Sequence, residues 1–150
     1  MISMKKLYIA YGSNLNIRQM ASRCPSASIY AHGLLNNWEL VFRGSPLNSH
    51  ATIRKKKGCQ TPVLVWSIGE RDESRLDRYE GYPYYYFKKN IMVQIDDQKK
   101  RAMVYIMNED FLPGRPSNQY VKSIRQGYRD NGFDLSVFNN ALEMNYIECR

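Results

Sequence analysis

The feature that most constrains the fold is a glycine-containing turn near the start of the chain. Residues 11–15 read Tyr-Gly-Ser-Asn-Leu and follow the apolar residues 7–10, Leu-Tyr-Ile-Ala. A short apolar run bounded by a turn predicts a buried strand, and Asn14 or Asn16 can cap a following helix that Pro25 ends. Such a connection leaves backbone N–H groups without partners on one side, which suits the binding of an oxyanion or a carboxylate.

The rest of the chain changes irregularly between strand and helix patterns. We expect strands at residues 28–32, 38–42, 51–53, 62–68, 86–95 and 101–107, and helices over 71–80, from Ser117 and from Asp134 to about 144. The strand at 62–68 is expected to be central because it is almost continuously apolar, and the basic run at 54–57 is expected to be a solvated loop. Strands interrupted by helices without a regular repeat favour an α+β fold.

Length and composition limit the classes of protein to consider. A chain of 150 residues with 43% hydrophobic residues predicts one globular domain spanning residues 1–150. A net charge of +8 is a weak signal for nucleic-acid binding, and we expect no nucleic-acid or membrane partner. The apolar run at 7–10 is too short for a signal peptide, and we expect a cytoplasmic protein. Three unpaired cysteines, Cys24, Cys59 and Cys149, predict free thiols, and no metal or other cofactor is expected.

Glu80 is the strongest candidate for chemistry. On the expected helix it shares a face with Leu76 and Tyr79, so we expect those two side chains to face the core and Glu80 to point inward or into a cleft. The macrodipole at the helix end and burial both disfavour the ionised form and raise the pKa of Glu80 towards the range useful for acid–base catalysis. The alternatives are a solvated surface Glu80 or one paired with an arginine. Glu73, in the first turn, suits the dipole and is expected to be a structural acid.

Taken together, these segments resemble the γ-glutamylcyclotransferase family, including its AIG2-like members. The resemblance rests on residues 8–15, on 76–81 (Leu-Asp-Arg-Tyr-Glu-Gly) with Tyr86 after it, on 105–107 (Tyr-Ile-Met) and on 116–120 (Pro-Ser-Asn-Gln-Tyr). It runs from about residue 6 to 133 and implies a small mixed β-barrel surrounded by helices. Asn14 separates the chain from the glutathione-directed branch, which resembles Tyr-Gly-Ser-Leu at this turn.

The resemblance also implies an activity, the release of 5-oxoproline from a small-molecule γ-glutamyl substrate. Glu80 would be the general acid and base. Carried over by position, the substrate site would be lined by Tyr8, Ile9, Ala10, Tyr11, Gly12, Ser13, Asn14, Tyr86, Tyr105 and Tyr120. The substrate's own α-amine attacks the γ-carbonyl, so no protein nucleophile and no cofactor are needed. Ser13 has no histidine in a convincing partner position and is not expected to be a nucleophile.

Two other functions stay open at this point. The same scaffold can serve as a non-catalytic binding module for an anionic metabolite, and a basic chain can bind nucleic acid. The leaving amine of the proposed reaction can belong to an amino acid, a lysine derivative or an antibiotic intermediate, and the oligomeric state is equally open. We expect specificity for the leaving amine to come from residues 44–57 and 111–116.

Overall fold

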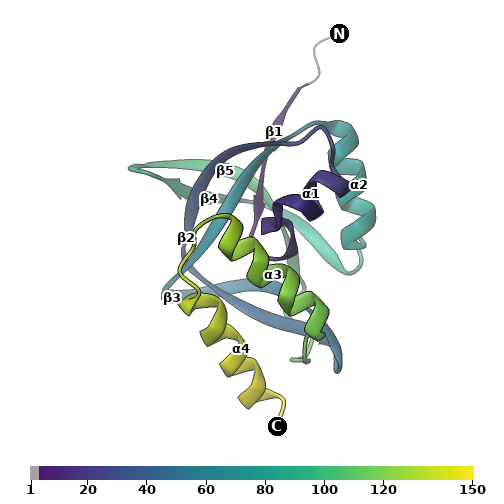
Figure 1. Ribbon diagram of the computed structural model, residues 1–150, viewed down its shortest axis with the longest axis vertical. Helices are drawn as coiled ribbons and strands as arrows, with labels where there is room; N and C mark the ends of the chain where they lie inside the picture. The colour runs from purple at the N-terminus through teal and green to yellow at the C-terminus, as the bar shows by residue number, and fades with distance from the viewer. Residues whose placement is uncertain (1–3) are drawn as a thin grey trace.

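Five strands close into a barrel in the computed structural model, which describes residues 4–150. The strands are β1 (Lys6–Ala10), β2 (Ser28–Ser45), β3 (Asn48–Ile68), β4 (Tyr86–Ile95) and β5 (Gln98–Met107). Their order around the barrel is β1, β3, β2, β4, β5, and β5 closes onto β1 by a parallel pairing while the other pairings are antiparallel. The predicted α+β fold with a small mixed barrel is confirmed (Figure 1).

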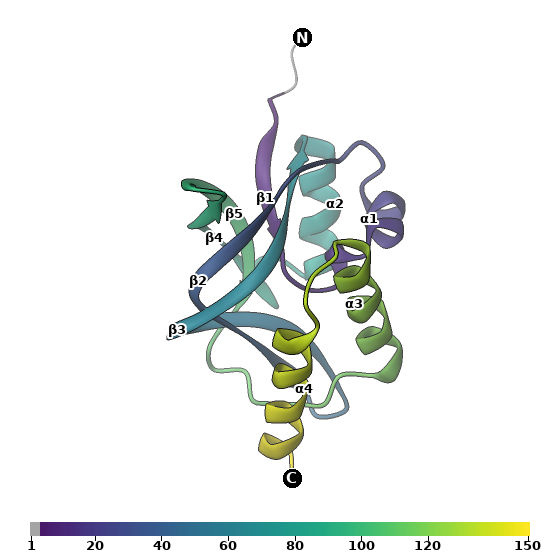
Figure 2. The same cartoon turned by 60° about the vertical axis from the view of Figure 1, so that its left-hand side comes forward.

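The helices pack on the outside of the barrel. They are α1 (Ile17–Arg23), α2 (Glu70–Glu80), α3 (Asn118–Asp130) and α4 (Ser136–Glu148), with one 3₁₀ turn, η1 (Ser13–Leu15), between β1 and α1. Figure 2 shows α1 beside α2 on one side of the strands, and α4 lies against β2. No helix within residues 4–150 has the length and apolarity that crossing a membrane would require.

Residues 62–68 form a central strand, as predicted. They are the last part of β3 and pair with β1 on one side and with β2 on the other. Val63, Leu64 and Val65 are completely buried. A strand covered on both faces has no polar side to alternate with its apolar one, which explains the nearly continuous apolar sequence.

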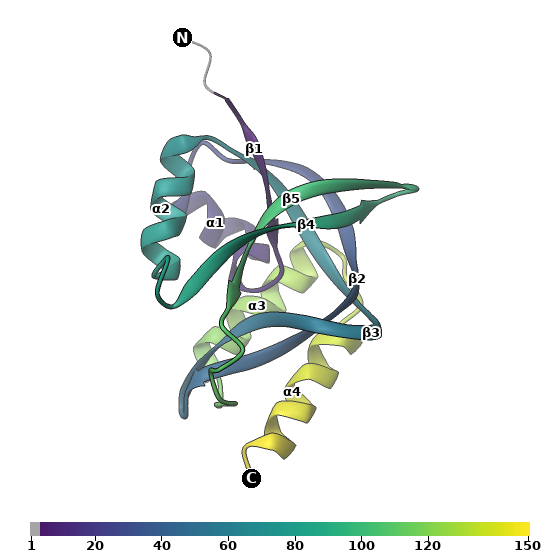
Figure 3. The ribbon, with the colours of Figure 1, turned by 180° about the vertical axis from the view of Figure 1, so that it is seen from behind.

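The prediction of a basic loop at residues 54–57 is wrong. These residues continue β3, which forms one long hairpin with β2 through pairs such as Trp38 with Lys55 (Figure 3). Residues 28–32 and 38–42 likewise belong to one strand, β2, with a bulge between them. The lysine side chains stay in solvent while the partner strand satisfies the backbone hydrogen bonds, so a basic run is compatible with a strand.

Local capping signals are confirmed at three helix ends. The side-chain oxygen of Asn16 accepts a hydrogen bond from the Gln19 N–H at 3.0 Å, and Ser117 Oγ accepts one from the Tyr120 N–H at 3.1 Å. Gly81 follows the last residue of α2 with φ of 66°, a left-handed conformation that glycine adopts without steric cost. The position of Gly81 fixes where α2 ends and therefore where the last side chain of that helix lies.

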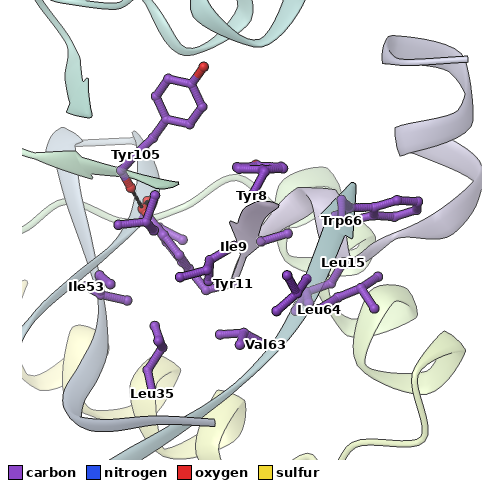
Figure 4. Close-up of a cluster of buried hydrophobic side chains, with 14 of the residues drawn as sticks. Tyr8, Ile9, Tyr11, Leu15, Leu35, Ile53, Val63, Leu64, Trp66 and Tyr105 are labelled. Atoms are coloured by element: carbon purple, nitrogen blue, oxygen red, sulfur yellow. Dashed lines mark hydrogen bonds between the residues drawn. The ribbon is translucent and has the colours of Figure 1, made fainter. Parts of the chain in front are cut away.

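The barrel interior forms the floor of the candidate site. Ile9, Leu35 and Val63 come from three different strands, and all are completely buried (Figure 4). Tyr11 lies in the same cluster and donates its hydroxyl hydrogen to the carbonyl oxygen of Tyr105 at 2.6 Å. Two tyrosine-bearing segments far apart in the sequence are thereby held together at the floor.

Candidate active site

A cavity of about 190 Å³ opens between the turn at residues 11–15 and the end of α2. It is lined by Tyr8, Ile9, Tyr11, Gly12, Ser13, Asn14, His50, Ala51, Tyr79, Glu80, Tyr85, Tyr86, Tyr105 and Tyr120. The structure thus brings together all the predicted site residues except Ala10. Ala10 pairs with Leu64 in β3, and its methyl group packs in the hydrophobic core.

Residues 12–14 of the turn after β1 line the cavity and carry unpaired backbone N–H groups. Within residues 4–150, the N–H groups of Gly12, Ser13 and Asn14 have no hydrogen-bond acceptor. A Cβ atom at position 12 would lie 3.2 Å from the Ala51 Cβ and 3.6 Å from the Tyr120 hydroxyl oxygen. Glycine at this position therefore keeps the cavity open beside these unpaired backbone N–H groups.

Arg23 at the end of α1 fixes this turn from outside. Its guanidinium donates to the side-chain oxygen of Asn14 at 2.5 Å and to Ser13 Oγ at 3.1 Å, and it also donates to the Tyr79 hydroxyl. The Asn14 side-chain amide in turn donates to the Tyr8 hydroxyl at 2.9 Å. Asn14 therefore connects the turn to the cavity floor, while Asn16, the other candidate, caps α1.

Glu80 is the last residue of α2, and its side chain lines the cavity. Its carboxylate has no hydrogen-bond or ion-pair partner among residues 4–150. Burial raises the pKa of Glu80 from 4.5 to about 7, and the positive charge of Arg23 opposes this rise only in part. A carboxyl group with a pKa near neutrality can take up and release a proton under working conditions.

The prediction for the neighbours of Glu80 is half right. Leu76 is completely buried, as expected, but Tyr79 is 48% exposed. The Tyr79 ring lies under the Arg23 guanidinium, whose central carbon is 3.5 Å from the ring centroid. This cation–π contact and the hydrogen bond from Arg23 to the Tyr79 hydroxyl hold Tyr79 at the rim of the cavity instead of in the core.

The hydroxyls of three lining tyrosines form hydrogen bonds within the protein around the cavity. Tyr86 donates to the Ala51 carbonyl oxygen at 2.6 Å, and the Ala51 N–H donates to the Tyr120 hydroxyl at 2.9 Å. Tyr105 also lines the cavity, and it donates its hydroxyl hydrogen to Asp77 at 2.5 Å. Burial raises the pKa of all three tyrosines above the usual value, so they remain neutral hydrogen-bonding groups.

Glu73 is a structural acid, as predicted. Its carboxylate forms ion pairs with Lys88 at 2.7 Å and with Lys6 at 2.9 Å. Partial burial opposes ionisation, but the hydrogen bonds from the two lysines outweigh it and lower the pKa of Glu73. Two carboxylates on one helix therefore have opposite environments, and Glu80 is the one suited to proton transfer.

Four lining residues, His50, Ala51, Tyr79 and Tyr85, were not predicted as members of the site. The His50 ring nitrogen Nδ1 shares a hydrogen bond of 2.8 Å with the Tyr85 hydroxyl. Tyr85 stands one position before the predicted Tyr86, and this proximity was the only sequence signal for it. Nothing in the sequence around His50 indicates that its strand passes the cavity, because the long β2–β3 pairing was itself not predicted.

The cavity offers a carboxyl group, neutral hydroxyls and backbone N–H groups for chemistry. Within the described part of the chain, no three His, Cys, Asp or Glu side chains are grouped as metal ligands would be. The three cysteines are unpaired thiols, as predicted. Proton transfer next to a binding site for negative charge is therefore the chemistry that these residues support.

Comparison with known proteins identifies the family. The sequence model of the family described as gamma-glutamyl cyclotransferase, AIG2-like, matches residues 8–128. The chain belongs to this family. The match covers both the turn at residues 11–15 and Glu80, so the predicted resemblance and membership of an enzyme family are confirmed.

Relatives that match over most of their length carry the same name. The gamma-glutamylcyclotransferase of Bos taurus is 30% identical over 93% of this chain and 79% of its own length, and that of Homo sapiens is 28% identical over 86% and 73%. A solved gamma-glutamyl cyclotransferase structure superposes with a TM-score of 0.82 at 27% identity, covering 93% of this chain and 87% of that one. Activity as a γ-glutamylcyclotransferase is supported by these names at about 30% identity.

A more distant structure shares only the fold. A yeast γ-glutamyl cyclotransferase described as specific to glutathione superposes with a TM-score of 0.63 at 10% identity, over 99% of this chain and 98% of that one. At this identity the likeness concerns the barrel and its helices. The argument that Asn14 separates this chain from the glutathione-directed branch stays a prediction.

Proposed function

We propose that this protein cyclises γ-glutamyl compounds, releasing 5-oxoproline and an amine or amino acid. The observation that carries the proposal is a partly buried Glu80, with a pKa near 7, facing the same cavity as the free N–H groups of the turn at residues 12–14. The Glu80 carboxyl group can transfer a proton, and the N–H groups of the turn can bind negative charge. Both are needed for attack by an amine on an amide.

The bond changes take place within the substrate, and Glu80 transfers the protons. The α-amine of the γ-glutamyl group forms a C–N bond to the γ-carbonyl carbon, which closes a five-membered ring. The amide bond to the leaving nitrogen then breaks. The α-amine attacks in its neutral form, and its ammonium form must first release a proton. From the neutral amine, one proton leaves the attacking nitrogen and one reaches the departing nitrogen, so no proton is gained or lost in this step. Glu80 accepts the first proton and delivers the second, which a carboxyl group with a pKa near 7 does with little free-energy cost in either direction.

The turn stabilises negative charge in this scheme. The γ-carbonyl oxygen becomes an oxyanion during attack, and the substrate also carries an α-carboxylate. The free N–H groups of Gly12, Ser13 and Asn14 suit either group, and their rigidity comes from the bonds that Arg23 makes to the turn. Holding the substrate folded on itself supplies further rate by orientation alone.

The test is the substitution Glu80→Gln. We expect 5-oxoproline release from γ-glutamyl compounds to be abolished, because glutamine cannot take up a proton, while circular dichroism shows an unchanged fold. Glu73→Gln on the same helix is the matched control and keeps its activity. Retained activity in Glu80→Gln would contradict the role of Glu80. A wild-type protein that is inert towards γ-glutamyl compounds but thermally stabilised by an anionic metabolite would favour the non-catalytic binding module instead.

A further inference from the structure

The lining of the cavity differs between its floor and its mouth. Tyr8, Tyr11 and Tyr86 form the floor and are at most 7% exposed. The rings near the opening, those of His50, Tyr85 and Tyr120, are only half-buried. In the proposed reaction the γ-glutamyl group occupies the floor, where it meets the turn. The leaving group then extends towards the mouth, so the half-buried rings are placed to contact it.

Three of these rings contact one another and form a continuous surface, which we call the aromatic wall: His50 from β3, Tyr85 from the segment before β4, and Tyr120 from α3. The His50 ring centroid lies 5.6 Å from that of Tyr85 and 5.0 Å from that of Tyr120, with interplanar angles of 87° and 84°. Phe111 is not among the lining residues and supports the wall by packing on Tyr85 at 5.4 Å and 86°. All are edge-to-face contacts in the preferred range of distances.

The aromatic wall is fixed and uncharged. The 2.8 Å hydrogen bond between His50 Nδ1 and the Tyr85 hydroxyl sets the orientation of both rings. Burial lowers the pKa of His50, so the imidazole is neutral at physiological pH. A rigid neutral surface of this kind binds apolar and aromatic groups at little entropic cost.

The cavity lining provides no cation for an anionic leaving group. Among the described residues that line it, none is a lysine or an arginine, and the acidic one is Glu80. Arg23 lies outside this lining, and its guanidinium donates to Ser13, Asn14 and Tyr79. A carboxylate on the leaving group would find no cation in the cavity and would be repelled by ionised Glu80.

We propose that the aromatic wall is the leaving-group subsite and that it selects γ-glutamyl amides whose leaving amine carries an uncharged aromatic ring. This inference rests on the proposed cyclisation and specifies its substrate class. It also refines the expectation that residues 44–57 and 111–116 determine specificity, because His50 lies in the first segment and Phe111, in the second, packs on Tyr85. The hydrogen-bonded pair of His50 and Tyr85 becomes the specificity determinant.

The test compares three synthetic compounds: γ-glutamyl-phenethylamide, γ-glutamyl-ethylamide, which lacks the ring, and γ-glutamyl-phenylalanine, which adds a carboxylate. For the wild type we expect kcat/KM for the phenethylamide to exceed both others by about tenfold or more. His50→Ala should bring the ratio of phenethylamide to ethylamide close to one. Tyr85→Phe, which keeps the ring but loses the hydrogen bond, should lower the ratio less. His32→Ala removes an exposed histidine outside the cavity and should leave the ratio unchanged.

Each ratio is measured on one preparation of protein, so a loss of folded enzyme scales both rates equally and does not change the ratio. No 5-oxoproline from any of the three compounds would overturn the proposed function and this inference with it. Release from the ethylamide with a wild-type ratio near one, or a preference for γ-glutamyl-phenylalanine, would overturn only the specificity. A ratio that survives in both His50→Ala and Tyr85→Phe would remove the aromatic wall as its source.

Discussion

Replacing Glu80 by glutamine should make the protein more stable while abolishing its activity. A rise in the pKa of Glu80 from 4.5 to about 7 means that burial penalises the ionised form in the folded state. Each pKa unit corresponds to about 1.4 kcal/mol, so ionised Glu80 lowers the free energy of unfolding by about 3 kcal/mol. Glutamine has the shape of a protonated glutamate and never ionises, so it escapes this penalty.

The size of this gain in stability depends on pH in a defined way. Between pH 4.5 and about 7 the folded protein holds a proton on Glu80 that the unfolded chain has lost, so wild-type stability falls as pH rises through this window. Above about pH 7 the penalty is complete, and below 4.5 both states are protonated and it disappears. We therefore expect Glu80→Gln to exceed the wild type by about 3 kcal/mol at pH 8 and by less than about 1 kcal/mol at pH 5.

Urea unfolding followed by circular dichroism at the two pH values measures this difference. In a thermal scan at pH 8 the gain corresponds to a rise in Tm on the order of 5–10 °C. Glu73→Gln is the matched control. It removes a carboxylate that has ion pairs with Lys6 and Lys88, so it should lower stability at pH 8, by about 1 kcal/mol or less, and keep activity. A Glu80→Gln variant no more stable than wild type at pH 8, or equally stabilised at both pH values, would refute the reasoning.

Three further outcomes test the rest of the site. We expect kcat/KM to fall as pH drops below about 7, because Glu80 becomes protonated. In Arg23→Met this fall should begin at a higher pH, because the guanidinium lowers the pKa of Glu80. A shift of the fall to lower pH would contradict this electrostatic role. Gly12→Ala should lower kcat/KM by about tenfold or more with little change in Tm, because the new Cβ atom would enter the cavity 3.2 Å from the Ala51 Cβ. Full activity in this variant would show that the cavity is not the substrate site. Ser13→Ala keeps its backbone N–H and should lower kcat/KM by less than about tenfold, whereas loss of a nucleophile would cost several orders of magnitude.

Predictions from local sequence signals agreed best with the structure. The turn after β1, the caps at Asn16 and Ser117, and the end of α2 at Gly81 each depend on a few neighbouring residues. The position of Glu80 at the last turn of a helix follows directly from Gly81. Backbone sterics and capping hydrogen bonds act within one or two turns, so these features can be predicted without knowledge of the fold.

Predictions that depended on distant partners agreed less well. The strand that includes residues 54–57 was not expected, because its backbone partners lie in β2 and its lysines give no apolar pattern. Tyr79 has the spacing of a core residue, yet Arg23 from another helix holds it at the rim of the cavity. Periodicity shows which side chains share a face of a helix, but not what covers that face.

The sequence by itself determined the two halves of the candidate site, namely the turn at residues 11–15 and Glu80, because each depends on local backbone geometry. Only the tertiary structure brought them to one cavity and added His50 and Tyr85 to its mouth. These residues lie tens of positions apart along the chain, and the closed barrel makes them neighbours by pairing β3 with both β1 and β2. The raised pKa of Glu80 belongs to the tertiary structure as well, since burial by distant segments is its main cause.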